Sequence, residues 1–238
     1  MPEDGWVGGK ARNDFNLRYN QVGAASATPR VRDSGLGGFG IPADHIADTR
    51  PYEIRWHGRG GQGAITAAKI FAQAAHLDGY LGATAAPSFG AERRGAPVSG
   101  STRISSRPIM VVSQIEEPDM VVVLDHTLLK DREVLSGLRT GGWLVVNCRQ
   151  APRHLNAEGE FNIATADATG ICRELGLIVG GLIIVNTAML GAVIRASGLV
   201  DLANLSKPIR DRFSNRAADL NLAAIEKTYR ETIIEKAR

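Results

Sequence analysis

The chain has 238 residues, of which 44% are hydrophobic and 22% charged, as in a globular protein with a substantial core. Its net charge of +3 predicts no nucleic-acid partner, and aromatic residues, at 5%, are too few to favour stacking on bases. The two cysteines, Cys148 and Cys172, cannot hold an iron–sulfur cluster by themselves, and we expect buried thiols in a reducing cytoplasm.

Residues 1–50 differ from the rest of the chain. They contain eight glycines, six acidic and six basic residues, and no helical or strand period. We therefore expect an N-terminal, non-globular extension without a core of its own. It is either flexible or lies extended across a partner, anchored there by large side chains such as Trp6, Phe15, Leu17 and Tyr19.

From Tyr52 onward, strand and helix patterns alternate. Strands are predicted at 53–57, 80–85, 98–105, 108–115, 120–124, 143–148 and 162–165. Helices are predicted at 64–77, 125–138, 168–176, 183–197, 208–213 and 215–237. The segments 98–105 and 108–115 are expected to pair through a short turn. This alternation predicts an α/β fold with a mostly parallel sheet flanked by helices, in a Rossmann-like three-layer arrangement.

The first strand and helix enclose a glycine-rich segment, EIRWHGRGGQG, at residues 53–63. A strand, a glycine turn and a helix start together bring backbone N–H groups close to an anionic ligand. The spacing also fits G-x-G-x-x-G, but a dinucleotide site needs an acid after the second strand. Asp78 precedes that strand and residues 84–88 contain no acid, which argues against a nicotinamide or flavin. An anion site and a purely structural turn remain as interpretations.

A second loop, PSFGAERRGAPV at residues 87–98, follows the second predicted strand. In an open parallel sheet, that strand end faces the same crevice as the glycine turn. The guanidinium groups of Arg93 and Arg94 suit a phosphate or a carboxylate. The alternative is a solvated charged loop in which Glu92 pairs with an arginine.

Other polar residues are expected to have local roles. His57 is interpreted as a hydrogen-bonding partner at a strand end, and Asp125 as the cap of the following helix. Asn186 and Thr187 are expected to satisfy a buried backbone or partner contact. The glycines and Arg195 that interrupt the apolar stretch 175–196 favour a core helix over a membrane span. No catalytic triad, Walker sequence or metal-ligand spacing is recognisable.

Four segments in order carry a family resemblance: EIRWHGRGGQGAITAAKIFAQAA, PSFGAERRGAPVSGSTRIS, EEPDMVVVLDHTLL and NTAMLGA. Together they resemble the gamma subunit, or gamma domain, of 2-oxoacid:ferredoxin oxidoreductases, most closely of the pyruvate type. The resemblance covers about residues 52–235, and it implies that residues 51–238 form a gamma-type domain. The extension of residues 1–50 departs from the family and is expected to wrap a partner subunit.

The resemblance implies an enzyme complex that decarboxylates a 2-oxoacid on thiamine diphosphate and Mg²⁺. Electrons then pass through [4Fe–4S] clusters to ferredoxin or an NAD-linked acceptor, and the acyl group usually passes to coenzyme A. These cofactors are expected in alpha, beta and delta-type partner subunits. This chain is expected to bind none of them alone, to hold no metal, and to carry no catalytic residue. A cytoplasmic location without a membrane or nucleic-acid partner is expected.

The resemblance further implies a role in shaping the coenzyme A approach and in subunit packing. The candidate residues for either role are Gly58, Arg59, Gly60, Gly61, Gln62, Gly63, Phe89, Glu92, Arg93 and Arg94. Two alternatives remain beside this interpretation. One is a stand-alone dinucleotide-binding oxidoreductase, and the other is a purely structural interaction subunit.

Overall fold

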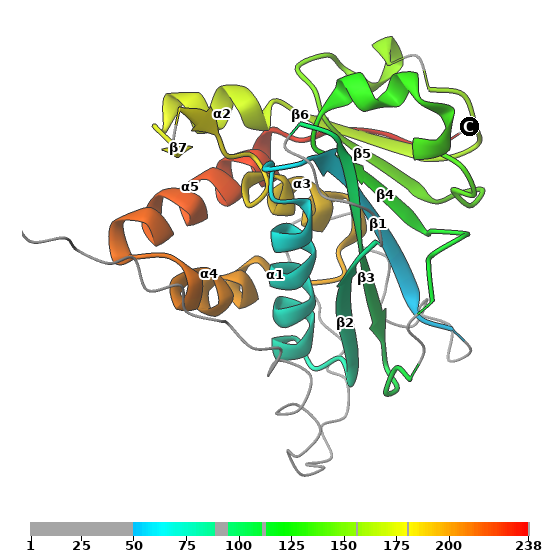
Figure 1. Cartoon of the computed structure of the whole chain (residues 1–238), viewed down its shortest axis with the longest axis horizontal. Coiled ribbons are helices and arrows are strands. Elements are labelled where there is room, and N and C mark those ends of the chain that lie inside the picture. Colours follow the sequence, from blue (N-terminus) through cyan, green and yellow to red (C-terminus); the bar gives the residue numbers. More distant parts are fainter. Residues whose placement is uncertain (1–49, 89–94, 111–112, 156, 180, 238) are drawn as a thin grey trace, which may run out of the picture. The chain divides into compact units, whose positions relative to one another are not determined.

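The computed structural model describes residues 50–88, 95–110, 113–155, 157–179 and 181–237. The predicted extension, except Arg50, lies outside this part of the chain. A seven-stranded sheet has the order β2–β3–β1–β4–β5–β6–β9 (Figure 1). Its strands are β1 (Tyr52–Arg59), β2 (Gly82–Pro87), β3 (Pro97–Ser105), β4 (Met120–Val123), β5 (Trp143–Asn147), β6 (Asn162–Ala166) and β9 (Ile233–Glu235).

The sheet is mixed. The central strands β1, β4, β5 and β6 are parallel, as the alternating pattern predicts. On one side, β3 lies antiparallel between β1 and β2; on the other, β9 is antiparallel to β6. Because β3 opposes both of its neighbours, β1 and β2 run in the same direction. Their carboxyl ends therefore lie at one edge of the sheet, as expected, although the two strands are not adjacent.

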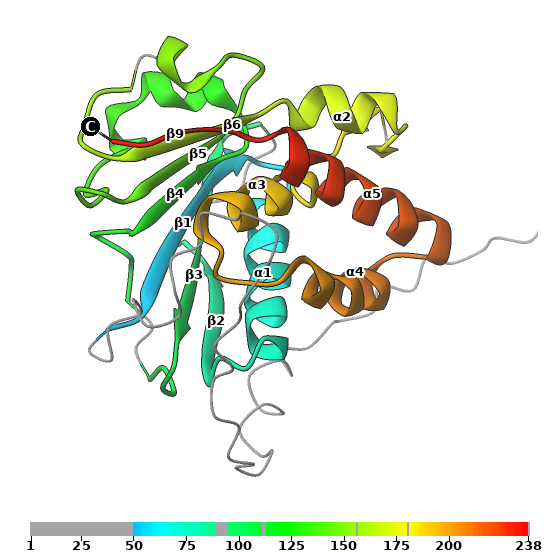
Figure 2. The same cartoon turned by 180° about the vertical axis from the view of Figure 1, so that it is seen from behind.

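Five α-helices lie on the same side of the sheet in both views (Figures 1 and 2). They are α1 (Ala64–Leu77), α2 (Ala168–Glu174), α3 (Ala188–Ser197), α4 (Ser206–Arg212) and α5 (Asn215–Glu231). α1 packs on β2 and β3, whereas α3 packs on β5, β6 and α5. None of the helices in the described ranges is both long and apolar enough to cross a membrane.

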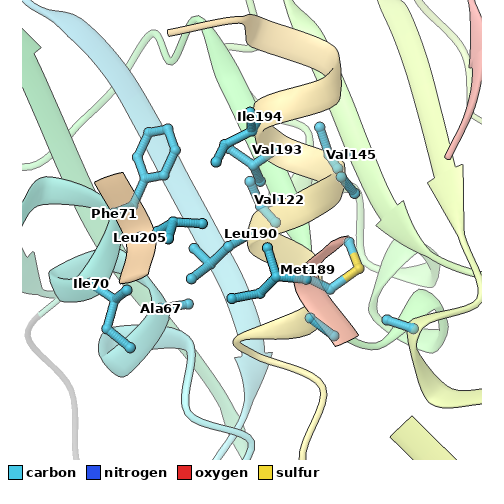
Figure 3. Packing of buried hydrophobic residues seen from close by; sticks show 14 of the residues in the cluster. Ala67, Ile70, Phe71, Val122, Val145, Met189, Leu190, Val193, Ile194 and Leu205 are labelled. Atoms are coloured by element: carbon cyan, nitrogen blue, oxygen red, sulfur yellow. The ribbon is translucent and has the colours of Figure 1, made fainter. Parts of the chain in front are cut away.

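The main core lies between these helices and the sheet. Phe71 and Ile70 of α1 face Leu190 and Val193 of α3, and β4 and β5 contribute Val122 and Val145 beneath them (Figure 3). The Trp56 indole N–H donates to Thr102 Oγ1 at 3.0 Å, so its polar atom is satisfied although the side chain is fully buried. Burial of this continuous apolar layer fixes α1 and α3 against the sheet.

Three 3₁₀-helices, η3 (His126–Lys130), η4 (Arg132–Val134) and η5 (Pro152–His154), lie on the other side of the sheet. They cover a smaller cluster that includes Val121, Val123, Leu144 and Val146. The predicted single helix at 125–138 is therefore wrong. The carboxylate of Asp131 accepts from Glu133 N at 3.0 Å and starts η4, which breaks the helix after one turn.

Three more predictions of secondary structure need correction. Residues 108–110 and 113–115 form no strand, because both edges of β3 are already paired with β1 and β2. The predicted helices 183–197 and 215–237 are shorter. A hairpin of β7 (Ile178–Val179) and β8 (Leu182–Ile183) precedes α3, and the chain after α5 joins the sheet as β9.

Candidate functional site

Polar residues gather where the parallel strands end. Arg59 ends β1, Asp125 comes shortly after β4, Asn147 ends β5 and Asp167 follows β6. Carboxyl ends of parallel strands form the usual ligand-binding edge of an open α/β sheet. Asp167 accepts from Gly170 N at 2.8 Å and caps α2, so its role is local. The remaining features of this edge centre on the glycine turn at residues 60–63.

The glycine turn is closed by its own hydrogen bonds. The amide of Gln62 donates to Arg59 O at 2.9 Å, and the amide of Arg59 donates to Gln62 Oε1 at 2.7 Å. Gly61 and Gly63 have φ values of 94° and 79°, a region that side-chain-bearing residues rarely adopt. Gly63 is the N-cap of α1, and among the described residues no side chain caps the start of this helix. The first amides of α1 therefore lack an intrahelical acceptor.

Gly58 does not belong to the turn. It lies within β1, and a Cβ there would meet Leu124 Cδ1 at 3.3 Å and Ala64 Cβ at 3.4 Å. Gly58 therefore serves the packing of α1 on the sheet. The G-x-G-x-x-G spacing thus combines one packing glycine with two turn glycines. Asp78 lies at the opposite end of α1, where its carboxylate accepts from Asp201 N at 2.6 Å.

The second loop meets the glycine turn through its described end. The amide of Gly60 donates to Ala96 O at 2.8 Å, and the amide of Gly95 donates to Gly60 O at 3.1 Å. The expectation that the two loops share one edge is confirmed for these residues. The pairing also occupies the Gly60 amide, so this candidate residue cannot donate that N–H to a ligand. Phe89, Glu92, Arg93 and Arg94 lie outside the described residues.

Arg59 is held by the neighbouring strand and loop. Its Nε lies 2.8 Å from Asp125 Oδ2, its Nη2 donates to Thr127 Oγ1 at 2.8 Å, and its Nη1 donates to Gly95 O at 3.3 Å. Burial opposes ionisation of Asp125, but hydrogen bonds from Thr127 and Arg59 outweigh it and lower the pKa. The Asp125 carboxylate also caps η3 as expected, accepting from Thr127 N at 3.0 Å.

His57 is a local hydrogen-bonding partner, as expected. Its Nε2 accepts from Arg55 Nε at 3.0 Å, and Arg55 also donates to Val134 O at 3.1 Å and Ser136 O at 2.5 Å. Burial and the neighbouring Arg55 charge lower the pKa of His57 to about 4. The imidazole is therefore neutral at pH 7 and can accept this bond.

Asn186 contacts the glycine turn directly. Its Nδ2 donates to Gly63 O at 3.2 Å from a side chain that is 4% exposed. The expected buried backbone contact is thus confirmed, but its target was not recognisable because 123 residues separate the two positions. The NTAMLGA motif was the available signal, since it places a polar pair before an apolar helix.

The described part of this edge resembles anion-binding sites in its backbone arrangement. It offers amides at the start of α1 next to a loop that carries two arginines in the sequence. Among the described residues, no group of three or more His, Cys, Asp or Glu side chains could hold a metal ion. Both cysteines are free and buried.

Comparison with known proteins shows the family. Residues 53–231 match the family described as pyruvate ferredoxin/flavodoxin oxidoreductase. The pyruvate/ketoisovalerate oxidoreductases common subunit gamma of Thermococcus kodakarensis is 45% identical over 185 residues, which cover 76% of this chain and 97% of that protein. The pyruvate synthase subunit PorC of Methanocaldococcus jannaschii is 45% identical over 181 residues, which cover 76% of this chain and 97% of that protein.

The fold agrees with a solved structure of the same kind. The crystal structure of pyruvate oxidoreductase subunit PORC from Thermotoga maritima matches with a TM-score of 0.68 and 35% identity, covering 79% of this chain and 99% of that one. The resemblance read from the four sequence segments is therefore confirmed. The chain belongs to the pyruvate ferredoxin/flavodoxin oxidoreductase family, as the gamma subunit of a 2-oxoacid oxidoreductase complex.

Proposed function

We propose that the glycine turn and the 87–98 loop form one side of the path by which coenzyme A reaches the assembled enzyme, and that this chain is not catalytic alone. The observation that carries the proposal is the pairing of Gly60 with Gly95 and Ala96. It joins the uncapped start of α1 to a loop whose sequence contains Arg93 and Arg94. Amide donors and guanidinium groups at one edge suit the phosphates of this co-substrate.

The described residues of the glycine turn have different roles in this proposed coenzyme A site. Gly61 is exposed, and a Cβ there would meet no atom of the described residues within 4 Å, so this part of the chain leaves the backbone of the turn open to a ligand. Arg59 is already paired with Asp125, and we assign it to fixing the turn. Gly61, Gly63 and the first amides of α1 are then the proposed donors, with Gln62 closing the turn. Phe89, Glu92, Arg93 and Arg94 complete the proposed site from the second loop.

The rest of the complex supplies the chemistry in this proposal. Thiamine diphosphate with Mg²⁺, [4Fe–4S] clusters and the path to ferredoxin or an NAD-linked acceptor belong to alpha, beta and delta-type subunits. Residues 1–50 extend across one of those subunits, and residues 51–238 form the gamma-type domain. A cytoplasmic location is part of the same proposal. An alternative keeps the complex but gives both loops a purely structural role, for which the exposed Gly61 offers a contact surface.

The test removes the two loop charges in the assembled enzyme. With Arg93→Ala/Arg94→Ala, we expect the KM for coenzyme A to rise by roughly tenfold or more, with kcat little changed, because ground-state binding is lost. Arg132→Ala, an exposed arginine of η4 on the other side of the sheet, is the matched control. An unchanged KM together with loss of assembly on size-exclusion chromatography would favour the purely structural role.

A further inference from the structure

Asn186 and Thr187 stand between the β8 strand and α3, at the start of the NTAMLGA segment. Both are buried, with exposed fractions of 4% and 0%. Nothing in the proposed function explains why this apolar helix begins with two buried polar residues. Buried amides and hydroxyls are retained where their hydrogen bonds are satisfied, because an unpaired one is costly. The contacts of each therefore indicate what the pair does.

Both polar atoms of the Asn186 side-chain amide form hydrogen bonds. Nδ2 donates to Gly63 O at 3.2 Å, and Oδ1 accepts from Thr187 N at 2.9 Å. Gly63 O is also the acceptor of the first hydrogen bond of α1, from Ala67 N at 3.0 Å. Asn186 thus holds the carbonyl at which the glycine turn becomes a helix.

The contact is close enough to explain the glycine at position 63. A Cβ on Gly63 would lie 2.3 Å from Asn186 Nδ2 and 3.0 Å from Asn186 Cγ. Gly63 also has a φ of 79°, so the position excludes a side chain for two separate reasons. The Asn186 side chain fills the space that a residue at 63 would take. Asn186 and the turn are therefore fitted to each other.

Thr187 and Gly191 hold the start of α3, next to Asn186, against α5. The Thr187 hydroxyl hydrogen-bonds to Asn221 Oδ1 of α5, and Asn221 Nδ2 donates to Ala217 O at 2.8 Å. A Cβ on Gly191 would lie 2.1 Å from Ile225 O, so the α3 and α5 backbones approach closely. This hydrogen bond and this close approach hold the start of α3 against α5. Three residues of NTAMLGA thus contribute to one clamp on the turn.

We propose that Asn186 is a positioning residue that holds the glycine turn in its ligand-receptive conformation. The inference rests on the proposed function, because it deepens the role of the same turn. The bonds of Arg59, Gln62 and Gly60 close the turn on one side, but two glycines with positive φ still add conformational freedom at its junction with α1, and ordering them on binding would weaken affinity. The clamp fixes the turn beforehand, so its amides point in fixed directions. Asn186 itself does not touch the ligand.

The test compares two asparagines that each donate to a glycine carbonyl, in the assembled complex. Asn162→Ala is the matched control, because Asn162 starts β6, at the edge of the sheet opposite the turn, and its Nδ2 donates to Gly141 O at 2.7 Å and Gly142 O at 3.1 Å. Hydrogen exchange of residues 60–66 reports on the turn without any ligand. We expect Asn186→Ala to accelerate this exchange and to raise the KM for coenzyme A roughly fivefold, with kcat little changed. Asn162→Ala should leave both unchanged.

The outcomes separate this inference from the proposed function. Unchanged exchange at residues 60–66 in Asn186→Ala overturns the inference, whatever the KM. Equal acceleration there in Asn162→Ala also overturns it, because the effect would then be general loosening. Faster exchange in Asn186→Ala alone, with an unchanged KM, supports the clamp and counts against the proposed coenzyme A role. If Asn186→Ala does not assemble, Asn186→Ser fills more of the space without reaching Gly63 O and gives the same comparison.

Discussion

The Arg59 guanidinium binds the Asp125 carboxylate, with Nε 2.8 Å from Oδ2, and so ties the end of β1 to the segment that follows β4. The arginine side chain is 37% exposed and the aspartate side chain 19% exposed, so solvent screens this pair in part. Thr127 and Gly95 accept further hydrogen bonds from the same guanidinium. Arg59 thus connects the glycine turn, the second loop and η3 at one point.

A double-mutant cycle with Arg59→Met and Asp125→Asn measures this pair. Asparagine still caps η3, so the cycle isolates the ion pair from the cap. We expect a coupling free energy of about 1 kcal/mol from urea unfolding at low salt, decreasing in high salt. The lowered pKa of Asp125 means that this stability is present above about pH 4 and is lost as the pH falls through the folded pKa. A coupling of zero at low salt would contradict the role of the pair.

Gly63→Ala tests the contact with Asn186. The new methyl group would collide with Asn186 Nδ2 and alanine would be strained at a φ of 79°, so we expect a loss of at least 2 kcal/mol in the free energy of unfolding. In the Asn186→Ala background the collision disappears, and the additional loss should shrink to the strain, about 1 kcal/mol. Gly61→Ala, at a φ of 94° and with no atom of the described residues within 4 Å of the new Cβ, is the strain-only control. Additive losses would exclude the close contact.

The elements that sequence patterns predicted are those with local causes. The apolar run at β4 and the glycine before α1 mark their own boundaries, and α1 has the predicted bounds of 64–77. β9 was missed because its strand conformation depends on pairing with Ile163, Ala164 and Thr165, far away in the chain. The amphipathic pattern of α5 continues past its end, so it gave no sign that Ile233–Glu235 joins the sheet.

The same distinction holds at the candidate site. The strand, turn and helix order around Gly60 and the capping role of Asp125 are local and were predicted. The Gly60 amide donates to Ala96 O, and the Asn186 side chain donates to Gly63 O. Both hydrogen bonds depend on how distant segments of the chain pack. A motif such as NTAMLGA can show that a segment matters, but only the tertiary contacts show that it acts on the turn.

His57 should make the stability of the chain depend on pH. Its pKa is lowered to about 4 by burial and by Arg55, whereas an unfolded histidine has a pKa of about 6.5. The unfolded state therefore binds more protons between these values, and stability falls as the pH decreases from about 6.5 to 4, by about 3 kcal/mol in all. His57→Gln should flatten this part of the pH profile in urea unfolding. His126→Gln, at an exposed histidine, controls for loss of an imidazole; equal profiles for wild type and His57→Gln would contradict the assignment.

In α3, Gly191→Ala combines a favourable change in helix propensity with an unfavourable change in packing. Helix propensity alone favours alanine by about 1 kcal/mol. The new Cβ would lie 2.1 Å from Ile225 O and 2.8 Å from Tyr229 N, and these backbone atoms can yield only if α3 and α5 separate. We expect the packing cost to dominate, with a net loss of at least 2 kcal/mol in thermal or urea unfolding. Separation would also stretch the bond between Thr187 and Asn221, so residues 60–66 should exchange hydrogen faster. A variant that is more stable than the wild type would show that the helices do not meet at this glycine.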